Sequence, residues 1–218
     1  MLTLQQFEDS YQKLIGHFTE GVYQDELMLA KKEFFRNTGT LDENKANYAL
    51  RMRQFFDWYF LTRKLTSHMQ TPLEVALEQR NLRLTPEDTE VLDILSKCQH
   101  SLYEFIKEKN DYFIVRDFFT NKKVEVQSVG QIFNFDDKES FEARLVEVNG
   151  KNYFLKGFCF HPQSAQKYIL DEIKSYRKNP DLDFEEFLIR LNKMRYKLEQ
   201  YKHIKPEMIY TNENKLKL

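Results

Sequence analysis

The sequence predicts an α+β fold with a helical N-terminal half, a small antiparallel β-sheet or partly open barrel, and C-terminal helices. Apolar residues recur three and four positions apart before residue 98, alternate with polar ones between residues 99 and 162, and then return to helical spacing. Only 6 glycines and 5 prolines interrupt the 218 residues, whereas 19 phenylalanines and 12 tyrosines supply bulky apolar side chains. This composition is typical of a packed globular chain that is long enough to bury a core without disulfides.

Residues 1–98 form the first region, and its opening half predicts two amphipathic helices. Thr3 can cap the first helix, and Gly39 can supply the left-handed turn that ends the second. The first helix carries a single apolar stripe at helical spacing, made of Leu4, Phe7, Tyr11, Leu14 and Phe18. We expect these two helices to form a hairpin.

The second half of this region predicts a central helix followed by two short ones. The segment from Asp42 to Lys64 is apolar on every face in its second half, which indicates burial by several neighbours. Thr71-Pro72 and Thr85-Pro86 each place a hydroxyl before a proline, with an acid three residues after the hydroxyl, and this pattern marks a helix start. The short helices should end near Arg80 and Lys97.

Residues 99–162 form the second region, where the pattern changes to short alternating runs rich in aromatic and β-branched residues. Five strands are expected, at Leu102–Lys107, Tyr112–Phe118, Lys122–Gln127, Phe141–Val148 and Asn152–Phe158. Asn149-Gly150 is the strongest hairpin signal, because both residues tolerate the positive φ of a tight turn.

The remaining chain predicts two closing helices over residues 163–205 and a flexible polar tail over residues 206–218. Asn179-Pro180 separates the helices, since a residue before proline is disfavoured in helical conformation.

Charge and cysteine usage limit the environment. The 33 basic and 34 acidic residues nearly cancel, which removes the attraction expected of a chain that binds nucleic acid or anionic membrane. Two cysteines give no disulfide framework, and no apolar run is long enough to span a bilayer. We therefore expect a cytoplasmic protein that has no membrane contact and no cofactor.

Several short patterns resemble those of a group of uncharacterised bacterial proteins. The patterns are Phe-x-x-Trp-Tyr-Phe (Phe55–Phe60), Thr-Pro-Leu-Glu (Thr71–Glu74), Ser-Leu-Tyr-Glu (Ser101–Glu104), Arg-Asp-Phe-Phe-Thr (Arg116–Thr120) and Glu-Ala-Arg-Leu (Glu142–Leu145). Many proteins of that group carry a cysteine-rich SEC-C zinc motif, which this chain lacks. The resemblance covers roughly residues 50 to 162, and it implies an architecture but neither a metal nor an activity.

A repeated Cys-x-His is the sharpest metal candidate. On extended chain, Cys98 and His100 would share one face, as would Cys159 and His161, so two paired strands could assemble four zinc ligands. However, this is not a common structural-zinc spacing, and an isolated cysteine is often a small buried apolar residue. The sequence therefore favours the structural interpretation and no bound metal.

Asp57 lies inside the most apolar run of the chain, where burial could raise its pKa and fit it for acid–base chemistry. Arg53 precedes it by four residues on the same helical face, so a buried ion pair between them is the simpler interpretation.

The last helix carries a narrow apolar seam typical of helices packed side by side. The seam consists of Phe184, Phe187, Leu191, Met194, Leu198 and Tyr201. It could bind another protein or a second copy of the chain, although packing inside the molecule is favoured because the seam is too short for a convincing coiled coil.

Three functions remain open. The first is a non-enzymatic cytoplasmic binding or scaffold protein that acts through protein contacts, because no catalytic set has recognisable spacing. The second is nucleic-acid binding through the sheet and the basic C-terminal tail, with Tyr112, Phe113, Phe118, Phe119, Tyr153 and Phe154 as stacking residues. The third is an enzyme whose site is assembled by folding, for which a pocket holding Asp57, Arg116 or Asp117 would be the sign.

Overall fold

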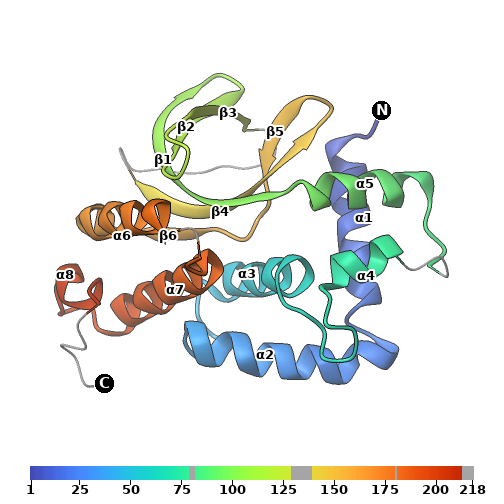
Figure 1. The fold of residues 1–218 in the computed structure, drawn as a ribbon, viewed down its shortest axis with the longest axis horizontal. Helices are drawn as coiled ribbons and strands as arrows, with labels where there is room; N and C mark the ends of the chain where they lie inside the picture. The colour runs from blue at the N-terminus through green and yellow to red at the C-terminus, as the bar shows by residue number, and fades with distance from the viewer. Residues whose placement is uncertain (79–81, 129–138, 180, 213–218) are drawn as a thin grey trace. The chain divides into compact units, whose positions relative to one another are not determined.

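The fold is known from a computed structural model, which describes residues 1–78, 82–128, 139–179 and 181–212 (Figure 1). The elements are α1 (Leu4–His17), η1 (Gly21–Tyr23), α2 (Gln24–Thr38), α3 (Tyr48–Leu61), α4 (Pro72–Glu78), α5 (Pro86–Ser96), β1 (Gln99–Lys109), β2 (Tyr112–Asp117), β3 (Lys123–Gln127), β4 (Ser140–Val148), β5 (Lys151–Phe154), β6 (Cys159–His161), η2 (Gln163–Ala165), α6 (Gln166–Lys178), α7 (Phe184–Gln200) and α8 (Pro206–Ile209). The predicted α+β class is confirmed, with helices on both sides of a curled antiparallel sheet in the chain order.

The chain divides into two compact units. Unit 1 contains Met1–Phe34, Asp42–Gln99 and Arg144–Gly157, and unit 2 contains Phe35–Leu41, His100–Ala143 and Phe158–Leu218. This division differs from the four consecutive regions expected from the sequence, because each unit collects segments that are distant along the chain.

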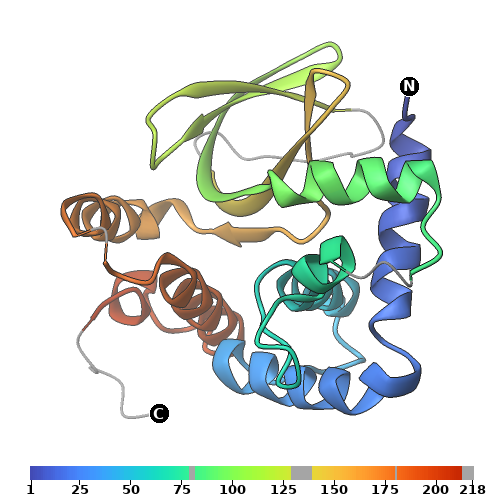
Figure 2. The ribbon, with the colours of Figure 1, turned by 45° about the vertical axis from the view of Figure 1, so that its right-hand side comes forward.

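In unit 1, α5 packs against α1 (Figure 2). Thr85 caps α5 through the predicted capping box with Asp88, and the Asp88 carboxylate also accepts hydrogen bonds from Ser10 and Lys13 of α1. One acidic residue therefore both starts α5 and joins it to α1.

The second half of α3 is buried on several sides, as its composition predicts. Phe55, Tyr59 and Phe60 are all fully buried, and the Tyr59 hydroxyl donates to the Phe18 carbonyl oxygen at 2.7 Å. The helix begins at Tyr48 instead of Asp42, since the Asp42 carboxylate accepts from the backbone N–H of Asn44 and forms a turn there.

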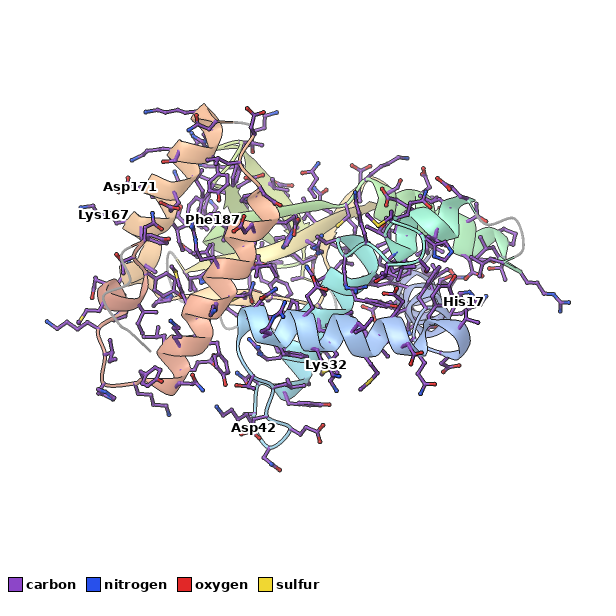
Figure 3. All side chains as sticks on the ribbon, turned by 60° about the horizontal axis from the view of Figure 1, so that its bottom comes forward. His17, Lys32, Asp42, Lys167, Asp171 and Phe187 are labelled. Carbon is purple, nitrogen blue, oxygen red and sulfur yellow. The ribbon has the colours of Figure 1, made fainter. Side chains whose placement is uncertain are left out.

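In unit 2, β2 pairs with β1 and β3, while the first half of β4 pairs with β6. Helices α6, α7 and α8 contribute to one hydrophobic cluster, to which Leu102 of β1 also belongs. Figure 3 shows Phe187 of α7 directed toward α6, whereas Lys167 and Asp171 lie on the outer side of α6.

Strand β4 passes from one unit into the other within its own length. Ser140–Ala143 belong to unit 2, and Arg144–Val148 belong to unit 1, where β4 pairs with β5. The predicted hairpin is confirmed, because Asn149 and Gly150 have φ values of 52° and 75° between these two strands.

Two other segments differ from the expectation. The strand expected over 152–158 ends at Phe154 as β5, residues 155–158 form a link in which the Leu155 N–H donates to the Arg144 carbonyl oxygen, and β6 is a further short strand beyond that range. Residues 206–209, expected within a tail, form α8, and Ile209 and Tyr210 are buried. The expected end of α4 near Arg80 lies outside the described residues.

Candidate functional site

Unit 1 contains a partly open pocket of about 480 Å³. This volume falls within the range of about 300–1,000 Å³ that is usual for small-molecule sites. The pocket has walls from α1, α3, β5 and the link that follows β5.

Helical spacing explains how two separate helices build the pocket. Leu4, Phe7, Tyr11 and Ile15 line it from α1, and Ala49, Met52, Phe56 and Asp57 line it from α3. The α1 set and the residues Ala49, Met52 and Phe56 recur every three or four positions, with Asp57 next to Phe56, so each set occupies one side of its helix. The stripe predicted for α1 is thus partly core and partly pocket wall.

Asp57 lies at the pocket with its side chain buried, and its Oδ1 accepts a hydrogen bond of 2.9 Å from the Tyr11 hydroxyl. Burial raises the pKa of Tyr11 well above its usual value, and the negative charge of Asp57 raises this pKa further. Tyr11 therefore remains a neutral hydrogen-bond donor to Asp57.

A cation and an ion pair also line the pocket. Lys156 Nζ lies 2.6 Å from Glu8 Oε2, and both side chains are partly exposed. Arg53 is exposed, and among the described residues it forms no ion pair. The described residues therefore do not show the expected buried pair of Arg53 and Asp57. Arg53 lies at the surface, and the Tyr11 hydroxyl donates a hydrogen bond to Asp57.

Gly157 lets the chain pass close to α3 behind the pocket. A β-carbon at this position would lie 3.1 Å from the Gln54 Cα and 3.2 Å from the Arg53 carbonyl oxygen, and it would also collide with the Asp57 carboxylate. Glycine is the residue that this approach permits.

The apolar seam of α7 packs inside unit 2. Phe187, Leu191 and Met194 are buried members of the cluster shared with α6 and α8, and Phe184 and Leu198 pack against that cluster. Tyr201 is partly exposed at the end of α7. These side chains form part of a core and do not present an exposed apolar stripe.

The aromatic residues considered for base stacking are divided between core and surface. Phe113 and Phe118 are buried in unit 2 and Phe154 in unit 1, while Tyr112, Phe119 and Tyr153 are partly exposed. Buried rings cannot stack on bases, so the aromatic surface available for nucleic acid is smaller than the sequence suggested.

Arg116 and Asp117, the other residues considered for an enzyme site, have structural partners in unit 2. Arg116 pairs with Glu104, and Asp117 Oδ1 accepts from the Ser101 hydroxyl and from the N–H groups of Phe119 and Thr120. Asp117 therefore holds the turn after β2.

The four Cys-x-His residues fall in different surroundings. Cys98 belongs to unit 1, whereas His100, Cys159 and His161 belong to unit 2. His100 Nε2 lies 2.9 Å from Glu142 Oε1, and its Nδ1 lies 2.7 Å from Glu185 Oε1. Cys159 and His161 lie beside Glu142 on the same face of the strands.

Sequence reasoning found Asp57 but missed the pocket around it. The signal was present in the two helical stripes, yet a stripe alone does not show whether it is filled by a neighbouring helix. The contributions of Leu155 and Lys156 come from far along the chain, and no local pattern marks them.

The fold and site together define an α+β protein with a mostly apolar pocket whose lining includes a buried tyrosine–aspartate pair. Residues 4–207 match the model of a family of unknown function, DUF7986, and the chain belongs to this family. This agrees with the resemblance to uncharacterised proteins, while the link to SEC-C proteins and the bacterial origin stay predictions. No curated protein and no solved structure matches the chain.

Among the described residues, no helix combines the length and apolarity required to cross a membrane.

Proposed function

We propose that this protein binds a small, mostly apolar molecule in the pocket of unit 1. The observation that supports this most directly is the pocket itself, whose mostly apolar walls include the buried Asp57. Apolar walls with a few placed polar groups are the usual form of a small-molecule site.

The polar groups suggest which end of the ligand is held. Asp57 accepts from Tyr11, and a ligand N–H or O–H group is the complement of an acidic residue and a phenol in an otherwise apolar wall. Arg53 and Lys156 are the more exposed groups and fit a second polar part of the ligand near solvent. The preferred ligand therefore has an apolar body and a hydrogen-bond donor.

N-Phenyl-1-naphthylamine, a neutral fluorophore with one N–H group, tests this proposal. We expect it to bind the purified protein with a saturable signal at one molecule per chain. Ala49→Trp should weaken binding at least about tenfold, because the indole occupies part of the pocket. Ala46→Trp is the matched control, since Ala46 is also exposed and does not line the pocket.

Equal binding by the wild type and Ala49→Trp, or the absence of a saturable signal, would contradict the proposal. The same naphthylamine body carrying a sulfonate serves as a second probe. Its sulfonate is the kind of polar group that Arg53 and Lys156 fit, so its affinity relative to the neutral probe shows whether these two cations contribute to binding.

Contact with another protein is a second candidate, as the sequence suggested. Its support in unit 1 is a group of exposed apolar side chains close together in the chain, namely Val22, Met28 and Leu29, which are exposed by 88%, 51% and 52%. Apolar residues of this size at the surface are common at interaction sites. Affinity purification from native cells, comparing the wild type with Met28→Ser, Leu29→Ser, tests it: a partner retained by both forms does not bind here.

A further inference from the structure

A carboxylate, a thiol and an imidazole meet on one face of β4 and β6 in unit 2. The two strands are antiparallel, with Glu142 opposite Cys159 and Ser140 opposite His161. Residues two apart on a strand point to the same side, so all four side chains share a face. One ligand atom each from Glu142, Cys159 and His161 lies within 4.8 Å of the others, and all three residues are buried.

The imidazole of His161 has unused bonding capacity. Its Nδ1 lies 3.1 Å from the Tyr210 hydroxyl, while its Nε2 is buried and has no hydrogen-bond partner among the described residues. An imidazole nitrogen that makes no hydrogen bond can offer its lone pair to a metal ion.

A second buried polar atom, on the residue paired with His161, also lacks a hydrogen-bond partner among the described residues. The Ser140 hydroxyl is fully buried and has no partner among the described residues. An unsatisfied buried polar group is costly, so two of them on directly paired residues indicate that a bound species belongs at this place.

The carboxylate of Glu142 is held in place by two donors. The Asn192 side-chain amide donates to Oε2 at 2.7 Å, and His100 lies 2.9 Å from Oε1. Asn192 also bonds the Leu188 carbonyl oxygen of its own helix, and His100 is fixed by Glu185. Hydrogen bonds that orient a ligating group in this way are a regular feature of metal centres.

We propose that Glu142, Cys159 and His161 bind one zinc ion, with the fourth coordination position next to Ser140. Sulfur and imidazole ligands favour zinc over calcium or magnesium. Binding removes the thiol proton, so the thiolate and the carboxylate bring two negative charges that balance the dication. Of the four residues that the sequence grouped as zinc ligands, Cys159 and His161 remain ligands. Glu142 is the third ligand, and His100 orients its carboxylate.

Titration of the reduced, chelator-stripped full-length protein with Co²⁺ tests the proposal. We expect one equivalent to bind with the absorption of a thiolate-to-cobalt transition, and zinc to displace it. Cys159→Ser should abolish that absorption, whereas Cys98→Ser should retain it, because Cys98 belongs to the other unit. Circular dichroism of both variants monitors their folding.

X-ray absorption of the zinc-loaded wild type needs no variant. One sulfur ligand at about 2.3 Å and nitrogen or oxygen ligands at about 2.0–2.2 Å are expected. A wild type that shows no saturable, sulfur-ligated site would overturn the proposal, and so would loss of the cobalt signal in Cys98→Ser with retention in Cys159→Ser. Asn192→Ala should weaken cobalt binding about tenfold, since it removes a donor to the ligating carboxylate.

Discussion

Asp88 is the residue in unit 1 with the clearest electrostatic consequence. Burial alone would raise its pKa, but hydrogen bonds from Lys13, Ser10 and the Thr85 backbone outweigh burial and lower this pKa from 3.8 to about 2. A carboxyl group whose pKa is lower in the folded state stabilises that state above its unfolded pKa and loses this contribution as pH falls.

Asp88→Asn should therefore lower the free energy of unfolding by about 2 kcal/mol near pH 7, the value of a shift of nearly two pKa units. The difference from the wild type should shrink as pH falls from about 4 toward 2. Urea unfolding at several pH values measures both. Asp93→Asn is the control, because Asp93 makes only an exposed ion pair with Lys97 on the same helix.

Replacing glycine by alanine should have opposite effects on stability at two positions in unit 1. Gly16 in α1 has nothing within 4 Å of an added β-carbon, so Gly16→Ala should stabilise the protein by about 0.5–1 kcal/mol through its helix preference. Gly157→Ala should destabilise it by about 1–3 kcal/mol, because the methyl group meets the α3 backbone. Thermal unfolding of the two variants side by side tests this, and equal effects would show that the close approach at Gly157 is not needed.

The case of Asp57 shows how far sequence reasoning reaches at the level of single residues. Its burial followed from the apolar run around it, but its partner did not, since helical spacing points only to groups on the same helix, such as Arg53. Tyr11 comes from a separate helix, and pairing across helices is decided by packing that one sequence does not display.

At the level of elements, α7 provides the sharpest test of the packing assignment. Leu191 is fully buried in the cluster of unit 2, so Leu191→Ala should lower the free energy of unfolding by about 2–5 kcal/mol. Lys193→Ala on the exposed face of the same helix should change it little. Urea unfolding measures stability, and size-exclusion chromatography measures association. A variant that dissociates without losing stability would indicate that the seam binds a partner.

Elements with strong local signals were predictable from the sequence. The capping box at Thr85 and the Asn149-Gly150 turn each have a chemical cause within four residues, and both are confirmed. The end of the expected 152–158 strand at Phe154 was not predictable, because it depends on Arg144 and on the close approach of Gly157 to α3.

Considering the whole molecule, the nearly balanced charge and the burial of Phe113, Phe118 and Phe154 argue against nucleic-acid binding. We expect no saturable binding to a single-stranded oligonucleotide at physiological salt, measured by fluorescence anisotropy. Binding that weakens steeply with added salt would contradict this and return attention to the basic residues of the C-terminal tail.

The α+β class could be predicted because it depends on periodicity summed over long segments. The two-unit organisation could not, since residues 144–157 join helices that precede them by about fifty residues or more. Two of the three proposed zinc ligands could be found in the sequence for the same reason: Cys159 and His161 lie two residues apart, whereas Glu142 joins them only through strand register.

The division within β4 has a consequence for how the chain is made on the ribosome. Unit 1 starts earlier along this sequence than unit 2, yet it lacks its last segment until Gly157 has been added, and by then residues 100–143 of unit 2 have already been made. The helices of unit 1 are therefore synthesised before residues 144–157, which complete the walls of their pocket. Nascent chains that stop before residue 144 should therefore depend on chaperones, because neither unit can close around its own core.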